Sequence, residues 1–148
     1  MTSVEQFLRL VATATGRKSP HQLILDHGRE YAWGGPKLPP GVRLGEKGAC
    51  FMNAYQLADA HPDKYTYVEG VASAIIPVDH AWCVTADGVV VDPTWRFKKG
   101  DAVPEYYGIP ISLKYAWRIM VKTRVYGVLW NYVGGFPMMT DKPEEWRA

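Results

Sequence analysis

Residues 80–95 read HAWCVTADGVVVDPTW, and this stretch decides the predicted fold. Two segments rich in β-branched and aromatic residues flank Asp87-Gly88, which is the strongest hairpin signal in the chain. The pattern therefore predicts two antiparallel strands at residues 80–85 and 89–94, joined by a tight turn.

The length of that turn determines which side chains share a face of the hairpin. A two-residue loop would place His80 and Asp92 on opposite faces, because side chains alternate along a strand. A three-residue loop of residues 86–88, ending on a glycine in the left-handed conformation, pairs Trp82 with Asp92 instead. His80 and Asp92 then lie on one face within hydrogen-bonding reach, and Cys83 lies on the other. We predict the three-residue loop.

A second cysteine stands at the predicted start of a helix. Residues 50–60, CFMNAYQLADA, are mostly helix formers, and the helix must end before Pro62. The free N–H groups and partial positive charge of a helix N-terminus favour a thiolate over a thiol, whose ordinary pKa is about 8.5. Gly48 permits a close approach of backbone N–H groups to a developing oxyanion. We therefore assign a nucleophilic role to Cys50 rather than to Cys83.

The remaining chain is consistent with one α+β domain spanning residues 1–148. Gly70 is expected to form a bulge, Glu69 is expected to be exposed, with lining of the cleft as its alternative, and Ser3 is expected to cap the first helix. Residues 112–123 and 125–132 carry both helical and strand signals. The other expected elements are helices at residues 3–14 and 20–27, an ordered Gly- and Pro-rich loop at 34–48, strands at 65–76 and 106–111, and a tail from about residue 134 whose aromatic residues either dock on the core or stay free.

Composition excludes several classes of protein. The chain has 148 residues and a formal net charge of +2, which disfavours a dominant polyanionic partner such as nucleic acid. Two cysteines are too few for a disulfide framework or a four-cysteine zinc site, and no short-spaced ligand pair is present, so we expect no metal and no cofactor. Lacking a signal-peptide pattern or an 18-residue apolar run, the chain is expected to be cytoplasmic, with no membrane partner.

Three motifs together carry a resemblance to a known superfamily. The segments GACFMNAYQLA at 48–58, HAWCV at 80–84 and VVVDPTW at 89–95 resemble, in order and context, the core of the transglutaminase-like superfamily within the wider papain-like group. The resemblance covers residues 48–95, about a third of the chain. It implies a papain-like/transglutaminase-like core in which a helix bearing the nucleophile packs on an antiparallel β-sheet.

The resemblance also implies a function. Cys50 corresponds to the nucleophile, His80 to the general base and then acid, and Asp92 to the residue that orients His80. A thiol-dependent hydrolase or acyltransferase would follow, acting through a thioester on a peptide, isopeptide or glutamine-type amide of a peptide or protein substrate. The superfamily includes peptidases, deamidases and transglutaminases, and the motifs leave hydrolysis and transfer open.

Further candidates line the predicted site less directly. Trp82 shares the face of His80, and Asn53 follows Cys50 by one helical turn, so both are candidate substrate-binding residues, with core packing and a surface or capping role as their respective alternatives. Trp33 is a third candidate. The second oxyanion donor is sought among upstream residues, without a spacing argument to choose among them: Gln22, Tyr31 and Trp33.

The alternative function is a non-catalytic binding module of the same fold. Residues 114–126 interleave cations with aromatic side chains, a composition that suits a peptide or nucleic-acid surface but is also typical of a solvated face. The residues concerned are Lys114, Tyr115, Trp117, Arg118, Lys122, Arg124 and Tyr126.

Overall fold

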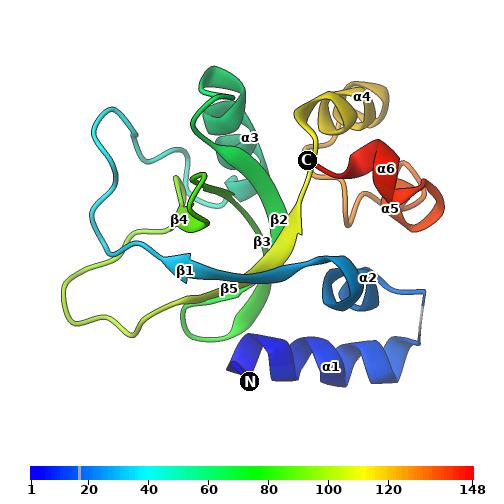
Figure 1. The fold of residues 1–148 in the computed structure, drawn as a ribbon, viewed down its shortest axis with the longest axis horizontal. Helices are drawn as coiled ribbons and strands as arrows, with labels where there is room; N and C mark the ends of the chain where they lie inside the picture. Colours follow the sequence, from blue (N-terminus) through cyan, green and yellow to red (C-terminus); the bar gives the residue numbers. More distant parts are fainter. Residues whose placement is uncertain (17) are drawn as a thin grey trace.

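The computed structural model describes residues 1–16 and 18–148 and shows a mixed α+β architecture (Figure 1). Five strands close into a small barrel in the order β1-β4-β3-β2-β5. β1 runs parallel to β4, and the other four neighbouring pairs are antiparallel. The strands are β1 (Arg29–Trp33), β2 (Thr66–Ser73), β3 (Pro77–Val84), β4 (Val89–Val91) and β5 (Glu105–Pro110).

In the described residues, six helices pack beside the barrel. In the view of Figure 1, α3 lies above the sheet, α1 lies below it, α2 lies beside the end of β1, and α4, α5 and α6 gather beside the C-terminus. Within the described residues, no helix has the length and apolar character needed to cross a bilayer. The helices are α1 (Ser3–Thr15), α2 (Pro20–His27), α3 (Cys50–Ala60), α4 (Leu113–Thr123), α5 (Pro137–Thr140) and α6 (Pro143–Trp146).

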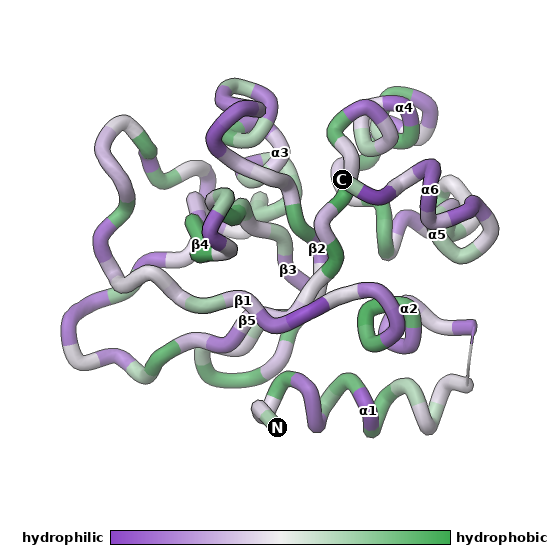
Figure 2. Tube along the Cα trace, viewed as in Figure 1, coloured by the Kyte–Doolittle hydropathy of each residue, from purple (hydrophilic) through white to green (hydrophobic). Residues whose placement is uncertain are grey.

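The first two helices begin with side-chain caps. Thr2, in extended conformation, accepts a hydrogen bond from the amide of Glu5, so Thr2 caps α1 and the predicted cap, Ser3, is its first residue. Ser19 caps α2 as predicted, and Pro20 occupies the first helical position. Figure 2 shows apolar residues alternating with polar ones along α1, and its apolar face is buried against the barrel and α2.

The β3–β4 hairpin confirms the predicted register. The Thr85 amide donates to the Val89 carbonyl at 2.9 Å, and Gly88 adopts a positive φ of 78°. Cys83 lies opposite Val91, so the next pair along is Trp82 and Asp92, as the three-residue loop requires. β4 ends at Val91, earlier than predicted, because Pro93 has no N–H to continue the ladder and Asp92 turns the chain with its side chain.

The sheet separates two apolar clusters. The interior of the barrel is small and aromatic, whereas the larger cluster fills the space between the outer face and the helices. Trp82 lies inside the barrel, and Cys83 lies in the outer cluster, as alternation along β3 dictates. The interior cluster comprises Tyr31, Val68, Ala72, Trp82, Val84, Val90 and Tyr106.

Gly70 does not form the predicted bulge. It pairs with His80 of β3 and Gly108 of β5 in an unbroken register on both sides. A Cβ at this position would lie 2.2 Å from the Tyr107 carbonyl oxygen, so a glycine is required by the close approach of β5 rather than by an extra residue.

Glu69 is buried, which contradicts its expected exposure. Its carboxylate accepts hydrogen bonds from the Tyr67 hydroxyl at 2.7 Å and from the amides of Val128 and Leu129 at 2.9 and 3.0 Å. Burial raises its pKa, although these three donors oppose the shift. The carboxylate is kept inside because it pairs amides from a distant loop that the strand pattern cannot reveal.

The C-terminal third shows which of the open alternatives each segment adopts. Residues 113–123 form α4, capped by the Ser112 hydroxyl, while residues 125–132 form turns. The segment from residue 134 docks on the core, because the side chains of Met138 and Trp146 are almost completely buried. Finally, β1 was not predicted, and its five residues become a strand only by pairing with both β5 and β4.

Candidate active site

Three elements meet around one open cavity of about 510 Å³. The start of α3 supplies Cys50, β3 supplies His80, and the loop after β4 supplies Trp95 and Arg96. Cys50 is half-buried and therefore accessible from this cavity, whereas the His80 ring is 2% exposed. The structure thus gathers a thiol and an imidazole that are thirty residues apart in the sequence.

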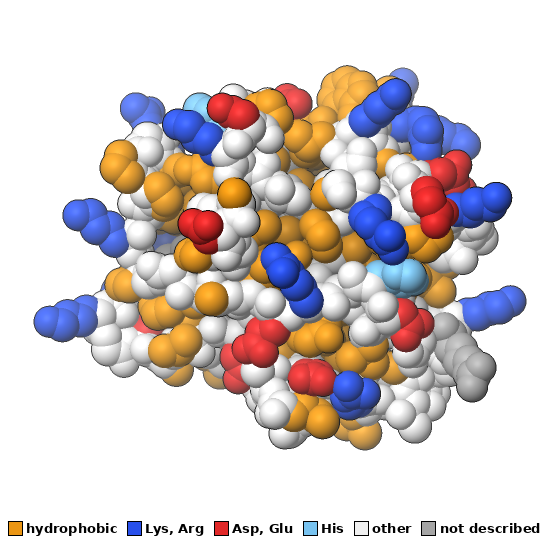
Figure 3. Space-filling model, in the orientation of Figure 1, with side chains coloured by type: hydrophobic (Ala, Val, Ile, Leu, Met, Phe, Trp, Pro, Cys, Tyr) orange, Lys and Arg blue, Asp and Glu red, His pale blue; other side chains and the backbone are white. Residues whose placement is uncertain are grey.

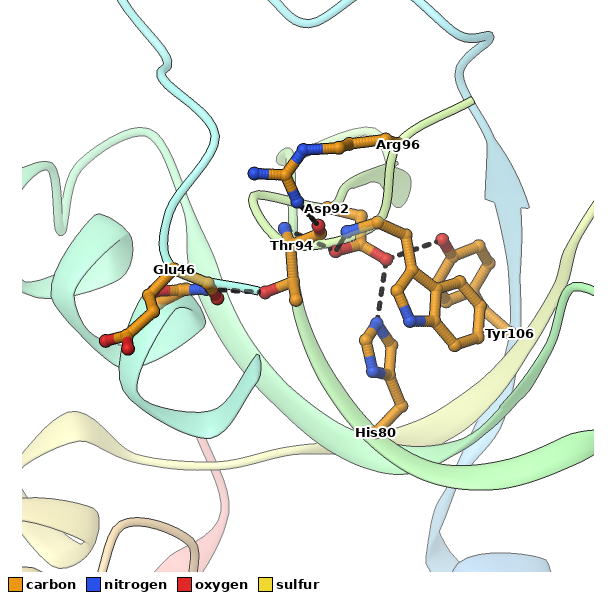
Figure 4. Close-up of polar contacts among 8 residues, drawn as sticks. Glu46, His80, Asp92, Thr94, Arg96 and Tyr106 are labelled. Carbon is orange, nitrogen blue, oxygen red and sulfur yellow. Dashed lines mark hydrogen bonds and ion pairs between the residues drawn. The ribbon is translucent and has the colours of Figure 1, made fainter. Parts of the chain in front are cut away.

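His80 and Asp92 form a buried pair, as the hairpin register predicts. His80 Nε2 lies 2.8 Å from Asp92 Oδ2, and Figure 4 shows this carboxylate between the rings of His80 and Tyr106. The Tyr106 hydroxyl donates to the same oxygen at 2.7 Å. Burial raises the pKa of Asp92, but the hydrogen bond and charge of His80, with the Tyr106 bond, outweigh it and hold the pKa below its usual value.

The second oxygen of Asp92 shapes the chain itself. Asp92 Oδ1 accepts from the amides of Thr94 at 2.9 Å and Trp95 at 3.2 Å, so the residue is also a turn former. The turn carries Trp95 over the imidazole, where the two rings stack with centroids 4.0 Å apart and planes 20° from parallel. One carboxylate therefore orients His80 and positions the ring that covers it.

The protonation of His80 is set by opposing influences. Burial lowers its pKa, but the hydrogen bond and charge of Asp92, with the nearby Cys50 sulfur, raise it to about 9. Nε2 faces Asp92, so Nδ1 is the ring nitrogen left for the thiol. Cys50 and His80 line the same cavity, and catalytic hydrogen bonds of this kind often form only when substrate binds.

The start of α3 leaves its first amides free for a ligand. Ala49 occupies the N-cap position without a side-chain hydrogen bond, and the first helical bond runs from the Asn53 amide to the Ala49 carbonyl at 2.9 Å. Gly48 has a φ of 81° and lines the cavity, so the chain turns into the helix directly beside Cys50. Backbone amides that are not used within a helix can donate hydrogen bonds to an oxyanion.

Two loops are joined to hold that helix start in place. The Gly45 amide donates to the Pro93 carbonyl at 2.7 Å, and Arg96 donates back to the Gly45 carbonyl at 3.3 Å. Asn53 donates to the Glu46 carbonyl at 2.8 Å and the Thr94 hydroxyl at 2.9 Å, where Glu46 and Thr94 face each other in Figure 4. Hydrogen bonds thus join the loops before α3 and after β4.

The three predicted substrate-binding residues do not line this cavity. Asn53 is buried, and its side-chain amide donates hydrogen bonds to both loops, so it positions Cys50 indirectly. Trp82 is fully buried inside the barrel, which corrects the expectation that it walls the site. Trp33 lies edge-on to Phe97 at 5.2 Å and lines a smaller cavity of about 100 Å³ behind Asp92.

The other upstream candidates are also elsewhere. Gln22 donates to Asp26 on the exposed side of α2, and Tyr31 is buried in the barrel interior. Neither residue lies among those that form the wall of the Cys50 cavity, so neither is placed to donate to an oxyanion there. The free amides at the start of α3 are the donors that the geometry offers instead.

Sequence reasoning missed several residues of the site. Trp95 was visible as the last residue of DPTW, and its stacking on His80 follows from the turn that Asp92 forms. Tyr106 gave no signal, because only closure of the barrel brings β5 beside Asp92. Asp79 and Lys47 add one acid and one base to the cavity wall, and neither carries a motif.

Cys83 and the basic segment lie away from the cavity. The Cys83 thiol donates to the Ala54 carbonyl at 3.1 Å on the outer face of the sheet, and burial raises its pKa. The cations of residues 114–124 gather over α4 in Figure 3, and Trp117 there stacks on Tyr55 with centroids 6.3 Å apart.

Comparison with known proteins found no match to this chain. No family model, no curated protein and no solved structure matches it. In the part of the chain that the structure describes, no group of three or more His, Cys, Asp or Glu side chains is arranged to hold a metal ion.

Proposed function

We propose that this chain is a cysteine-nucleophile enzyme with a transglutaminase-like core, which hydrolyses or transfers an amide of a peptide or protein. The observation that carries the proposal is the buried His80–Asp92 pair, bonded at 2.8 Å and opening with Cys50 into one cavity. Buried histidine–carboxylate pairs also occur for structural reasons, but a half-buried thiol at a helix start beside the ring adds the third component of a triad.

The first half of the reaction forms a thioester. The Cys50 thiolate attacks the substrate carbonyl carbon, and the carbonyl oxygen becomes an oxyanion facing the free amides at the start of α3. The C–N bond then breaks, and His80 donates its Nδ1 proton to the departing amine. Asp92 stabilises the charged ring and fixes its orientation throughout.

The second half of the reaction releases the acyl group. A water molecule or a second amine attacks the thioester carbonyl while His80, now neutral, accepts the proton of the attacking group. The C–S bond breaks, and the Cys50 thiolate and His80 imidazolium are restored. Water gives hydrolysis or deamidation, whereas an amine gives transfer.

Differential labelling of the two cysteines tests the proposal. With iodoacetamide at neutral pH, Cys50 is expected to react at least about 100-fold faster than Cys83, because only Cys50 faces a cavity and an imidazolium. Peptide mass spectrometry measures both rates. His80→Ala should slow the labelling of Cys50 about 10- to 100-fold, whereas the control His61→Ala, at an exposed histidine, should not.

Two further measurements complete the test. Incubation with a mixed peptide library, followed by mass spectrometry, distinguishes cleavage, loss of a side-chain amide and cross-linking. Equal and slow labelling of both thiols, with no change in the peptides, would overturn the proposal. A binding module would be favoured in that event if oligonucleotide or acidic-peptide binding depended on salt and on the exposed cations Lys114 and Arg118.

A further inference from the structure

A second cavity adjoins the one that contains Cys50. It has a volume of about 360 Å³ and shares Trp95 and Arg96 with the catalytic cavity, so the two cavities adjoin at these side chains. The turn between β2 and β3 forms one wall with Ala74 and Ile75. The loop between β4 and β5 forms the other wall, where Phe97 and Ala102 are apolar.

An aromatic wall leads from the catalytic ring to this second cavity. Trp95 stacks on His80 with one face and meets Phe97 edge-on, with centroids 6.2 Å apart and planes 80° from each other. Trp95 and Phe97 both line the second cavity. A substrate bound at Cys50 therefore continues along an apolar surface rather than into open water.

The tip of the β2–β3 hairpin is unusually apolar for a turn. Ile75 is 94% exposed and Ile76 is 67% exposed, at positions where turns ordinarily carry Gly, Asn, Asp or Ser. Neither side chain contributes to a core cluster. Exposed aliphatic side chains at the rim of a cavity mark a binding site, because a ligand that covers them removes their surface from water.

The charges in the second cavity indicate what kind of chain it receives. Arg96 and Asp101 are the charged residues of its lining, and their opposite signs give no preference for an acid or a base. Arg96 already donates to the Thr94 and Gly45 carbonyls, and Asp101 Oδ2 accepts from the Lys98 amide. The remaining guanidinium N–H groups and Asp101 Oδ1 suit the C=O and N–H groups of a polypeptide and have no partner on a hydrocarbon chain. The walls therefore fit an aliphatic side chain attached to a peptide backbone.

We propose that this cavity is a substrate subsite for a bulky aliphatic side chain, such as that of leucine, within two residues of the amide that Cys50 attacks. The inference rests on the proposed function and names its substrate class. Adjacent cavities that share Trp95 are spanned by one or two residues of extended chain, which advances about 3.3 Å per residue. Ile75 closes over the bound side chain from the hairpin tip.

Peptidyl chloromethyl ketones test the subsite for hydrolysis and transfer alike, because each reagent alkylates Cys50 only after its peptide has bound. Two series carry leucine, alanine or aspartate at the first or second residue before the reactive group. The leucine reagent is expected to react about 10- to 200-fold faster than its alanine counterpart in at least one series, since a hydrophobic pocket discriminates in this range.

Matched variants locate the effect. Ile75→Gln should reduce the ratio of leucine to alanine rates at least about fivefold. The Ile75 side chain lies in an exposed turn, so the substitution should not affect folding. The control Leu10→Gln makes the same polar change at another exposed aliphatic residue, on α1, and should leave the ratio unchanged. The rate with iodoacetamide, which has no peptide, should be the same in both variants and in the wild type.

The outcomes separate the two proposals. Equal rates with leucine and alanine reagents, or a ratio that Ile75→Gln does not change, would overturn the subsite even when iodoacetamide labelling of Cys50 still depends on His80. The subsite would also be overturned if a fatty-acyl chloromethyl ketone alkylated Cys50 faster than the leucine peptides and this difference in rate disappeared in Ile75→Gln. The occupant would then be a lipid chain. Loss of His80-dependent labelling would instead overturn the proposed function itself.

Discussion

Two carboxylates are buried on opposite faces of the same sheet, and they serve different purposes. Asp92 faces the barrel interior, where it meets a titratable ring, His80. Glu69 faces the outer cluster, where it meets only a hydroxyl and two backbone amides. The comparison shows that burial alone does not determine the charge of a buried carboxyl group, because its pKa also depends on whether its partner can carry a charge.

The electrostatic consequences have opposite signs. Burial raises the pKa of both groups, but the cationic partner of Asp92 reverses the shift, whereas the neutral donors around Glu69 do not. Asp92 therefore remains ionised beside a cation that it helps to keep protonated. Glu69 instead fastens the loop at residues 127–129 to the outer face of β2.

Removing the charge of Asp92 should have the largest effect. In Asp92→Asn the side chain keeps its size but no longer stabilises the charged ring, so the rate of any reaction through Cys50 is expected to fall about 10³- to 10⁴-fold at neutral pH. kcat/KM on a peptide substrate, or the rate of Cys50 alkylation by a leucine reagent, measures it. A change smaller than about threefold would show that Asp92 is a turn former and nothing more.

Removing the charge of Glu69 should affect folding instead. In Glu69→Gln an NH2 group replaces one acceptor oxygen, which removes the acceptor of the Leu129 amide if it stands at Oε1, or that of the Tyr67 hydroxyl if it stands at Oε2. We expect the free energy of unfolding to fall by about 1–3 kcal/mol, as measured by urea denaturation. Labelling of Cys50 should be unchanged, and the exposed control Glu144→Gln should alter neither quantity.

The pH dependence of stability should distinguish the two carboxylates most finely. Asp92 has a lowered pKa in the folded state. Its contribution to the free energy of unfolding is therefore present above the ordinary pKa of 3.8 and is lost as pH falls through the pKa of the folded state. Glu69 has a raised pKa in the folded state. Its contribution to the free energy of unfolding is therefore present below the ordinary pKa of 4.5 and is lost as pH rises through the pKa of the folded state.

Urea denaturation of each variant beside the wild type from pH 3 to 7 measures this difference. The stability advantage of wild type over Asp92→Asn should grow as pH rises, and the advantage over Glu69→Gln should shrink. The slope for either variant is at most about 1.4 kcal/mol per pH unit for one proton. Parallel slopes for the two variants would contradict the assignment of opposite shifts.

Local patterns predicted the parts of the site that depend on strand parity and helix ends. Side-chain alternation showed that a three-residue loop ending at Gly88 would place His80 with Asp92 and Cys83 on the other face, and the loop was predicted on that ground. The helix that begins at Cys50 followed from its composition and the proline after it. These features are set by neighbours within a few residues, so sequence reasoning reaches them.

Other features depend on contacts between residues that are distant in the sequence, which local patterns do not reveal. Glu69 reads as a polar residue on a strand, and it is buried only because a loop sixty residues later supplies its donors. Trp82 reads as a possible wall of the site, and it is core because the barrel closes around it. The region from residue 134 reads as a tail, yet its Trp146 fills the outer cluster.

The sequence alone predicted three functional groups in chain order: a thiol at a helix start, then an imidazole and a carboxylate on one face of a hairpin. Those are short-range properties of backbone geometry, and they follow from spacing and turn type. Only the tertiary contacts place the thiol and the ring at one cavity, bring Tyr106 and Trp95 against the His80–Asp92 pair, and add an apolar cavity beside it. Closure of the barrel and the joining of two loops across α3 bring together residues that have no local reason to meet.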